Sequence, residues 1–172
     1  MNFAVRQAEA DGATGVSEER EAREAYVEAI RLIERAHRRF LDVVKDELDR
    51  LGRDEVNNVQ AVLLHNLGRE ELTPSELKAR GYYLGSNVSY NLKKLNELGY
   101  LVQNRSNRDR RTVRISVTEK GAEVAAIVEG LIERQMRSLQ PIAGVDADSL
   151  DGAMQTLRRL DRFWKDQVLY RL

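Results

Sequence analysis

The sequence contains no cysteine, two prolines and two histidines among its 172 residues. Without a thiol, the chain forms no disulfide, offers no thiolate metal ligand or cysteine nucleophile, and cannot sense peroxide through a thiol. The two histidines, His37 and His65, have no carboxylate three or four positions after them, as a helical metal site of that pattern would have. The sequence therefore predicts a protein without a bound metal or other cofactor.

Long apolar runs and catalytic signatures are absent as well. No stretch approaches the length of a membrane span, and residues 1–17 lack the apolar block of a signal peptide. There is no nucleophile elbow or dinucleotide fingerprint, and the segment 81–85 lacks the lysine and threonine of a phosphate-binding loop. These absences predict a cytoplasmic protein that is not an enzyme and has no membrane partner.

Charge is balanced over the whole chain but unevenly distributed along it. The sequence has 28 basic and 28 acidic residues, yet the segment from Leu84 to Arg114 holds seven basic and two acidic residues, a net charge of +5. A neutral chain with one strongly basic segment indicates a localised surface for an acidic partner such as nucleic acid. The alternative is a solvated hairpin that binds nothing.

The segment from residue 73 to residue 99 predicts two short helices separated by a turn. The run TPSE at residues 73–76 is a capping box with proline in the first turn, so a helix begins there and ends before Gly81. A second helix opens near Gly85 and Ser86, and Gly99 ends it. Its apolar stripe consists of Val88, Leu92, Leu95 and Leu98. Its other faces carry mostly hydrogen-bonding side chains: Ser86, Asn87, Ser89, Tyr90, Asn91, Lys93 and Lys94.

A hairpin with a cationic tip follows the second helix. Residues 100–103 and residues 112–117 favour strands, and the segment that joins them contains Arg105, Arg108, Arg110 and Arg111. A helix fits the major groove of B-DNA, and an arginine on a hairpin can enter the narrow minor groove beside it. The order of these elements therefore favours a DNA-binding function.

The segment 84–102 (LGSNVSYNLKKLNELGYLV), the run Asp109-Arg110-Arg111 and the segment 117–121 (VTEKG) resemble the winged-helix core of MarR-type bacterial transcriptional regulators. The resemblance covers about a third of the chain by motif and nearly all of it by helix order. It implies that the second helix enters the major groove and that Asp109 orients Arg111 toward the minor groove. It also implies dimerisation through the first and last helices. The family often binds small anionic or phenolic effectors, but the long N-terminal segment departs from its pattern, so no effector is carried across.

Candidate DNA contacts follow from these elements. Small polar side chains at the start of a helix approach base edges and adjacent phosphates closely, and basic residues bind phosphates or the minor groove. Hydroxyl and amide donors at the start of the first short helix can bind one phosphate, although capping alone accounts for Thr73. The candidates are Thr73, Ser75, Ser86, Asn87, Ser89, Tyr90, Lys93, Arg108, Asp109, Arg110 and Arg111.

The chain before this region predicts one long helix. Residues 1–17 show no sustained periodicity and are interpreted as a frayed, flexible arm. Residues 18–51 predict a highly charged helix that Gly52 closes, and Asp54 is a candidate cap for a further helix that ends at Gly68. One apolar stripe runs along the long helix: Ile30, Ile33, His37, Phe40, Val44, Leu48 and Leu51.

The chain after the hairpin predicts two amphipathic helices. Thr118 is the candidate cap of the first, which ends where Pro141 and Gly144 break its pattern, and the second starts near Asp146–Asp148. The second carries an apolar stripe of Leu150, Met154, Leu157, Leu160, Trp164 and Val168. Amphipathic helices at both ends of a small domain favour pairing between two chains, with an intramolecular bundle as the alternative.

The predicted fold is mainly α with a small β-hairpin wing: a winged helix-turn-helix with N- and C-terminal dimerisation helices. Its parts are the arm at 1–17, a dimerisation helix at 18–51, the DNA-binding region at 52–120 and dimerisation helices at 121–172. The predicted function is a homodimeric transcriptional regulator on a pseudo-palindromic double-stranded DNA operator. One alternative is a winged-helix module that binds protein through its wing. Control by a small-molecule effector is compatible with the first; His37, which interrupts an apolar stripe, is its candidate residue, with a satisfied interface histidine as the other interpretation.

Overall fold

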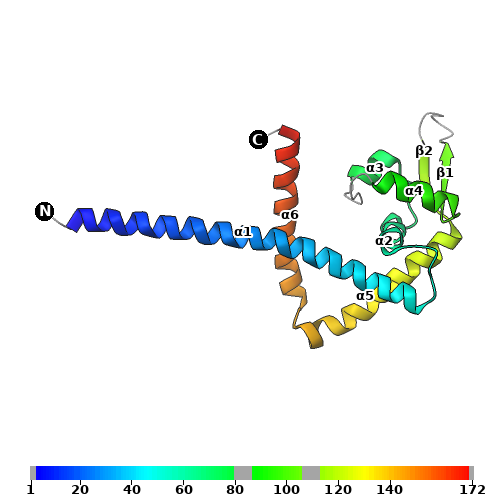
Figure 1. The fold of residues 1–172 in the computed structure, drawn as a ribbon, viewed down its shortest axis with the longest axis horizontal. Helices are drawn as coiled ribbons and strands as arrows, with labels where there is room; N and C mark the ends of the chain where they lie inside the picture. The colour runs from blue at the N-terminus through cyan, green and yellow to red at the C-terminus, as the bar shows by residue number, and fades with distance from the viewer. Residues whose placement is uncertain (1–2, 80–86, 106–112, 171–172) are drawn as a thin grey trace. The chain divides into compact units, whose positions relative to one another are not determined.

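The computed structural model describes residues 3–79, 87–105 and 113–170 (Figure 1). Contacts divide the chain into two compact units, Met1–Gln60 and Ala61–Leu172. The described residues form helices and one antiparallel hairpin in the order α1, α2, α3, α4, β1, β2, α5 and α6. The predicted fold class, mainly α with a β-hairpin wing, is confirmed.

Helix α1 spans Phe3–Arg50, a length of 48 residues. It begins well before Glu18, so the prediction that the helix starts only at residue 18 is wrong, and residues 3–17 are helical. That segment has no proline to break a helix and contains four alanines, so the helix can continue there although apolar periodicity is missing. At the other end, Gly52 adopts a left-handed conformation (φ 64°), and the Arg53 amide donates to the Leu48 carbonyl at 2.9 Å, as in a helix C-cap.

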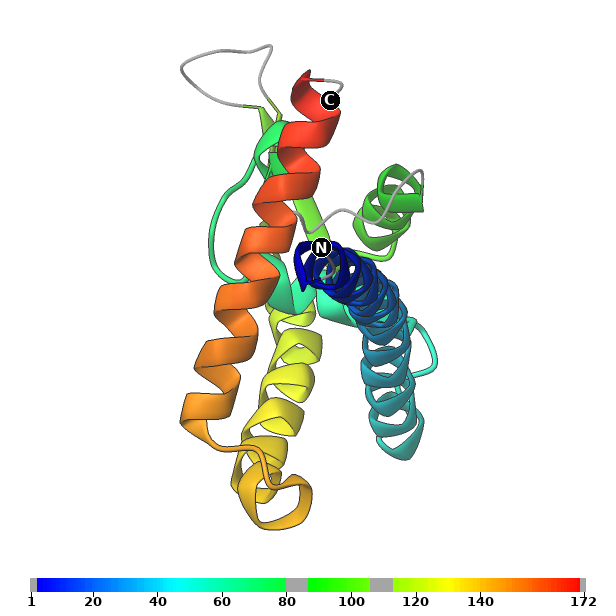
Figure 2. The same cartoon turned by 90° about the vertical axis from the view of Figure 1, so that its left-hand side faces the viewer.

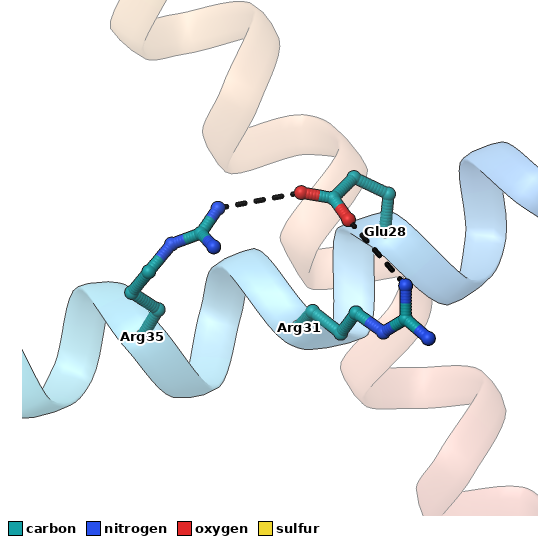
Figure 3. Close-up of polar contacts among 3 residues, drawn as sticks. All are labelled: Glu28, Arg31 and Arg35. Carbon is teal, nitrogen blue, oxygen red and sulfur yellow. Dashed lines mark hydrogen bonds and ion pairs between the residues drawn. The ribbon is translucent and has the colours of Figure 1, made fainter.

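The long sides of α1 carry networks of exposed ion pairs. Glu28 accepts from Arg35 at 3.3 Å and lies 4.0 Å from Arg31, so one carboxylate faces two guanidinium groups (Figure 3). Exposed pairs of this kind contribute little stability each, about 0.2–1 kcal/mol. These side chains keep the helix solvated along its charged faces.

The predicted apolar stripe of α1 is buried only toward its C-terminal end. Val44 and Leu48 are buried, and Phe40 is half-buried. Leu51 lies beyond the last helical residue and is exposed. His37 is exposed as well.

Helix α2 spans Asn58–Leu67. Its cap is Asn57 and not the predicted Asp54: the Gln60 amide donates to Asn57 Oδ1 at 2.9 Å, and the Asn57 amide donates to Gln60 Oε1 at 3.0 Å. This reciprocal capping box lies directly before the helix, whereas Asp54 lies too far upstream to reach its first amides. Gly68 (φ 57°) ends α2 as predicted.

The core of the second unit lies around the hairpin. Helix α3 (Pro74–Ala79) and helix α5 (Glu119–Ala143) both contact strand β2 (Val113–Val117), and helix α4 (Asn87–Glu97) contacts strand β1 (Leu101–Arg105). Each large apolar side chain that is buried here stabilises the fold by roughly 1.5–3 kcal/mol. The buried apolar residues of this unit include Leu64, Leu67, Leu72, Leu77, Leu92, Leu95, Tyr100, Leu101, Ile115, Val124, Val128 and Leu131.

Helices α5 and α6 (Ala147–Tyr170) meet at a turn in the lower part of Figure 2. The predicted break at Pro141 is wrong, because that proline lies inside α5, which continues to Ala143. The stop is Gly144, whose left-handed conformation (φ 67°) turns the chain while its amide donates to the Gln140 carbonyl at 3.0 Å. None of the helices in the described part of the chain contains an apolar stretch of the length that a membrane span requires.

Candidate DNA-binding surface

The outward face of α4 is the centre of the candidate surface. Tyr90 is 64% exposed, and the side chains of Lys93 and Glu97 are 78% and 51% exposed. These three residues follow one another at spacings of three and four, so they lie on one line along the helix. Ser89, at the flank of this line, is also exposed. The predicted contact residues of α4 therefore include a solvent-facing set that a ligand can reach.

The opposite face of α4 packs into the core. Leu92 and Leu95 are buried, as predicted, but Asn91 is also buried, with 6% exposure. Its placement on a polar outer face was wrong. Asn91 lies one turn before Leu95 and beside Leu92, so it falls at the edge of the apolar stripe and is carried into the core with it.

The start of α3 is fixed by the predicted capping box. The Glu76 amide donates to Thr73 Oγ1 at 3.1 Å, and the Thr73 amide donates to Glu76 Oε2 at 2.7 Å. The Thr73 side chain thus has a structural role at this position. Ser75, the other candidate phosphate contact in this turn, is exposed.

The wing strands occur close to where they were predicted. In the antiparallel pair, Leu101 faces Val117 and Arg105 faces Val113. Leu72 adds a short third segment that sequence patterns did not reveal: its amide donates to the Ile115 carbonyl at 3.0 Å, and the Ile115 amide donates back at 2.8 Å. The bridge ties β2 to the residues just before α3.

Arg114 belongs to this connection and not to a free cationic surface. One of its guanidinium nitrogens donates to the Glu71 carbonyl at 3.1 Å, and its side chain is only partly exposed. Its inclusion in the basic segment of the sequence gave no sign of this role, because counting charges does not show which side chains bond to the backbone. Arg114 therefore holds the wing strand to the α2–α3 loop.

Several predicted contacts lie outside the described residues. They are Ser86 and the wing-tip residues Arg108, Asp109, Arg110 and Arg111. Asn87 is the first residue of α4. Of the cations on the described part of α4, Lys93 lies 3.9 Å from the Glu97 carboxylate. This exposed pair is weak, so a phosphate can replace the carboxylate as the partner of Lys93.

One cavity of about 260 Å³ lies where α1 turns into α2. Four of its polar residues already have partners within the protein: Lys45 pairs with Asp49, and Asn57 and Asn58 bond to nearby backbone groups. His37 is not among its lining residues. Nothing in this cavity links His37 to an effector.

Comparisons with known proteins agree with this geometry. A family model described as "Winged helix DNA-binding domain" matches residues 56–121. The exopolysaccharide II synthesis transcriptional activator ExpG of Rhizobium meliloti (strain 1021) is 38% identical over 145 residues, which cover 84% of this chain and 74% of that protein.

Two solved structures resemble the chain in fold. A mutant of MarR from E. coli complexed with operator DNA gives a TM-score of 0.60 at 21% identity, and the match covers 76% of this chain and 91% of that chain. The transcriptional regulator BldR from Sulfolobus solfataricus gives 0.62 at 19% identity, covering 77% and 94%. At such low identity, the likeness concerns the fold.

Proposed function

The chain belongs to the MarR-type family of winged helix-turn-helix transcriptional regulators, and from this premise we propose that it binds a pseudo-palindromic DNA operator as a homodimer. The observation that supports this most strongly is the outward face of α4, where Tyr90, Lys93 and the neighbouring Ser89 are accessible. A helix with such a face fits the major groove, and two helices about one DNA turn apart read two half-sites.

Within this surface the side chains have different tasks. We assign base-edge and adjacent phosphate contacts to Ser86, Asn87, Ser89 and Tyr90, because polar groups near the start of a recognition helix approach the bases. Lys93 binds the phosphate backbone, for which its long side chain and charge are suited.

The wing and the start of α3 complete the proposed contacts. The wing arginines Arg108, Arg110 and Arg111 enter or flank the minor groove, and Asp109 orients Arg111 there, as in the family pattern. Ser75 and Thr73 lie at the start of α3, where hydroxyl groups can reach a phosphate.

The apolar stripe of α6 supports dimerisation. No residue of α6 is buried, although Leu150, Met154 and Leu157 recur at spacings of three and four. A stripe of this size is stabilised when a second copy covers it. Pairing of the terminal helices also sets the distance between two recognition helices, which a palindromic site requires.

Regulation and location follow from the same premise. The relative from R. meliloti is an activator, which supports activation as the effect on transcription. The proposal includes control by a small-molecule effector, but no pocket is assigned to it. His37, which is exposed on α1, is the candidate residue for contact with such an effector. We assign the chain no enzymatic activity and place it in the cytoplasm with its operator.

Competition binding tests the proposal once genomic mapping has supplied a cognate duplex. Asn87→Ala and Ser89→Ala should reduce the difference in binding free energy between cognate and random duplexes by roughly 1–3 kcal/mol, with the salt dependence of binding nearly unchanged. Lys93→Ala should weaken binding to both duplexes alike. It should also lower the slope of log affinity against log salt concentration by about one unit, because one phosphate contact is lost. Circular dichroism verifies that each variant folds.

Two outcomes would contradict the assignment. If the polar variants keep the wild-type ratio of cognate to random affinity, α4 is not the recognition helix. If the wild type binds no duplex with a steep salt dependence, a protein-binding winged-helix module becomes the better description.

A further inference from the structure

The C-terminal end of α4 is bonded to the beginning of α5. Three successive carbonyls lie directly after the last residue of α4: those of Leu98, Gly99 and Tyr100. Thr118 Oγ1 donates to the Gly99 carbonyl at 2.8 Å, the Thr118 amide donates to the Tyr100 carbonyl at 3.1 Å, and Lys120 Nζ donates to the Leu98 carbonyl at 3.0 Å. The amides that follow α4 bond to carbonyls of its last turn, those of Lys94, Leu95 and Asn96, whereas the carbonyls of Leu98, Gly99 and Tyr100 lie beyond the helix and bond to groups from elsewhere. Here those groups come from the first turn of α5 and its cap.

Lys120 makes more than one interaction with this end of α4. Its Nζ also lies 4.1 Å from the centre of the Tyr100 ring, a cation–π geometry, and Tyr100 is fully buried. The ammonium charge stands where the helix dipole of α4 is negative, which is a further favourable interaction. Although Lys120 is an exposed residue, its charged group interacts with the Leu98 carbonyl and the Tyr100 ring, both directly after α4, and with the negative end of the α4 dipole.

The two helices have no spare room at this point. A Cβ atom added to Gly121 would lie 2.2 Å from the Tyr100 carbonyl oxygen, so the backbone of α5 rests directly on that of Tyr100. The Tyr100 amide in turn donates to the Leu95 carbonyl at 2.9 Å, inside α4. A displacement of the start of α5 is therefore transmitted to the last turn of α4.

We propose that Lys120 is a positioning residue for DNA recognition, which rests on the proposed function of α4. By holding the end of α4 against α5, Lys120 fixes the direction in which Tyr90 and its neighbours face the bases. It acts through the Leu98 carbonyl and the Tyr100 ring and makes no contact with DNA. Helix α5 leads to α6, the proposed dimer helix, which sets the distance between the two recognition helices. Because Lys120 joins α5 to the end of α4, it also couples that distance to the orientation of each recognition helix.

Lys120→Met is the test variant, because methionine keeps an unbranched apolar side chain but removes the charge and the donor. We expect the ratio of cognate to random affinity to fall roughly three- to tenfold, with the salt slope unchanged. Lys120→Arg, which keeps the charge and can donate to the same carbonyl, should keep the wild-type ratio. Lys165→Met removes one exposed charge from α6 and should leave both the ratio and the slope at wild-type values.

Hydrogen exchange without DNA separates this role from the proposed function. Lys120→Met should accelerate exchange of the Tyr100 amide, and Lys120→Arg should not. A wild type without preference for any duplex would overturn the proposed function, while the exchange experiment would still decide whether Lys120 holds α4. The positioning role is overturned if Lys120→Met keeps the wild-type ratio of cognate to random affinity. It is also overturned if Lys120→Met weakens binding to both duplexes equally and lowers the salt slope by about one, as the loss of a phosphate contact would.

Discussion

Helices α4 and α6 carry apolar stripes of the same kind, yet only one stripe is buried. In α4, Leu95 has no exposed surface, whereas Leu157 at the middle of the α6 stripe is 46% exposed. The winged-helix region supplies a partner for α4 through β1, which follows it in the chain. An apolar stripe thus indicates that a helix needs a partner but does not tell whether that partner belongs to the same chain.

The two helices also differ in how they are held. The end of α4 is bonded to Thr118 and Lys120, about twenty residues away along the chain. In α6, Ser149 bonds to Asp146 and Gln155 bonds to Asp151, partners three and four positions away. We therefore expect substitutions in the two regions to affect different properties, folding in one and assembly in the other.

The largest effect should come from Gly121→Ala in the winged-helix region. Its Cβ would meet the Tyr100 backbone at 2.2 Å, and a backbone atom cannot move aside as a flexible side chain can. We expect the free energy of unfolding to fall by about 3 kcal/mol. Urea denaturation followed by circular dichroism measures this.

The matched control is Gly152→Ala on α6, where an added Cβ meets no atom within 4 Å. It should raise the free energy of unfolding by about 0.5–1 kcal/mol, because alanine favours a helix more than glycine does. Equal effects of the two substitutions would mean that α5 does not rest on Tyr100.

A smaller effect, on assembly alone, is expected from Leu157→Arg. A charge in the middle of the α6 stripe should weaken the proposed dimer by about 2 kcal/mol, or roughly thirtyfold in its dissociation constant, while the unfolding of the winged-helix region stays unchanged. Sedimentation equilibrium over a range of concentrations measures the change.

Gln155→Arg provides the control for this variant. Residues two positions apart on a helix point to nearly opposite sides, so the same charge is introduced away from the stripe. The dimer should keep its wild-type strength. If Leu157→Arg also stays dimeric at every concentration, another surface joins the two chains.

The smallest effect concerns the start of α6 and its dependence on pH. The Ser149 hydroxyl and then the Ser149 amide donate to Asp146, and these bonds lower the pKa of its carboxyl from the ordinary value of 3.8. A lowered folded pKa means that the stabilisation is complete above the ordinary value and is lost as pH falls through the lowered one. The first turn of α6 should therefore fray only in strong acid.

The pH dependence of the Ser149 amide chemical shift measures this. Asp146→Asn keeps an oxygen acceptor without a carboxyl proton and should remove the transition. The start of α5 is capped by the Thr118 hydroxyl, which has no proton to lose in this pH range, so the Gly121 amide that it accepts from should show no such transition either. A transition of the same size in Asp146→Asn would show that another group titrates at this turn.

Features that depend on neighbouring residues could be predicted from sequence. The capping box of Thr73 and Glu76, the helix stop at Gly99 and the hairpin follow from residue types a few positions apart, and the structure confirms them. The exposure of Ser89, Tyr90 and Lys93 follows in the same way from helical periodicity. These are the parts of the candidate site that local patterns determine.

Features that depend on distant residues could not be predicted. The burial of Asn91 is decided by what packs against the edge of α4, and the roles of Arg114 and Lys120 are decided by carbonyls many positions away. From the sequence alone, Arg114 and Lys120 can be described only as positively charged residues. The early start of α1 has another reason, because a segment without proline can continue a helix without an apolar stripe.

The bridge between Leu72 and Ile115 has a consequence for the order of folding. It joins residues 43 positions apart, a separation that the neighbouring bond from Arg114 to Glu71 also spans. Closing a loop of that length costs about 3 kcal/mol in chain entropy, and two backbone hydrogen bonds do not repay this in an otherwise unfolded chain. Once α3 and α4 have formed and collapsed, the effective loop is far shorter. The bridge is therefore expected to form late, after the helices it encloses, and substitutions at Leu72 should speed unfolding more than they slow folding.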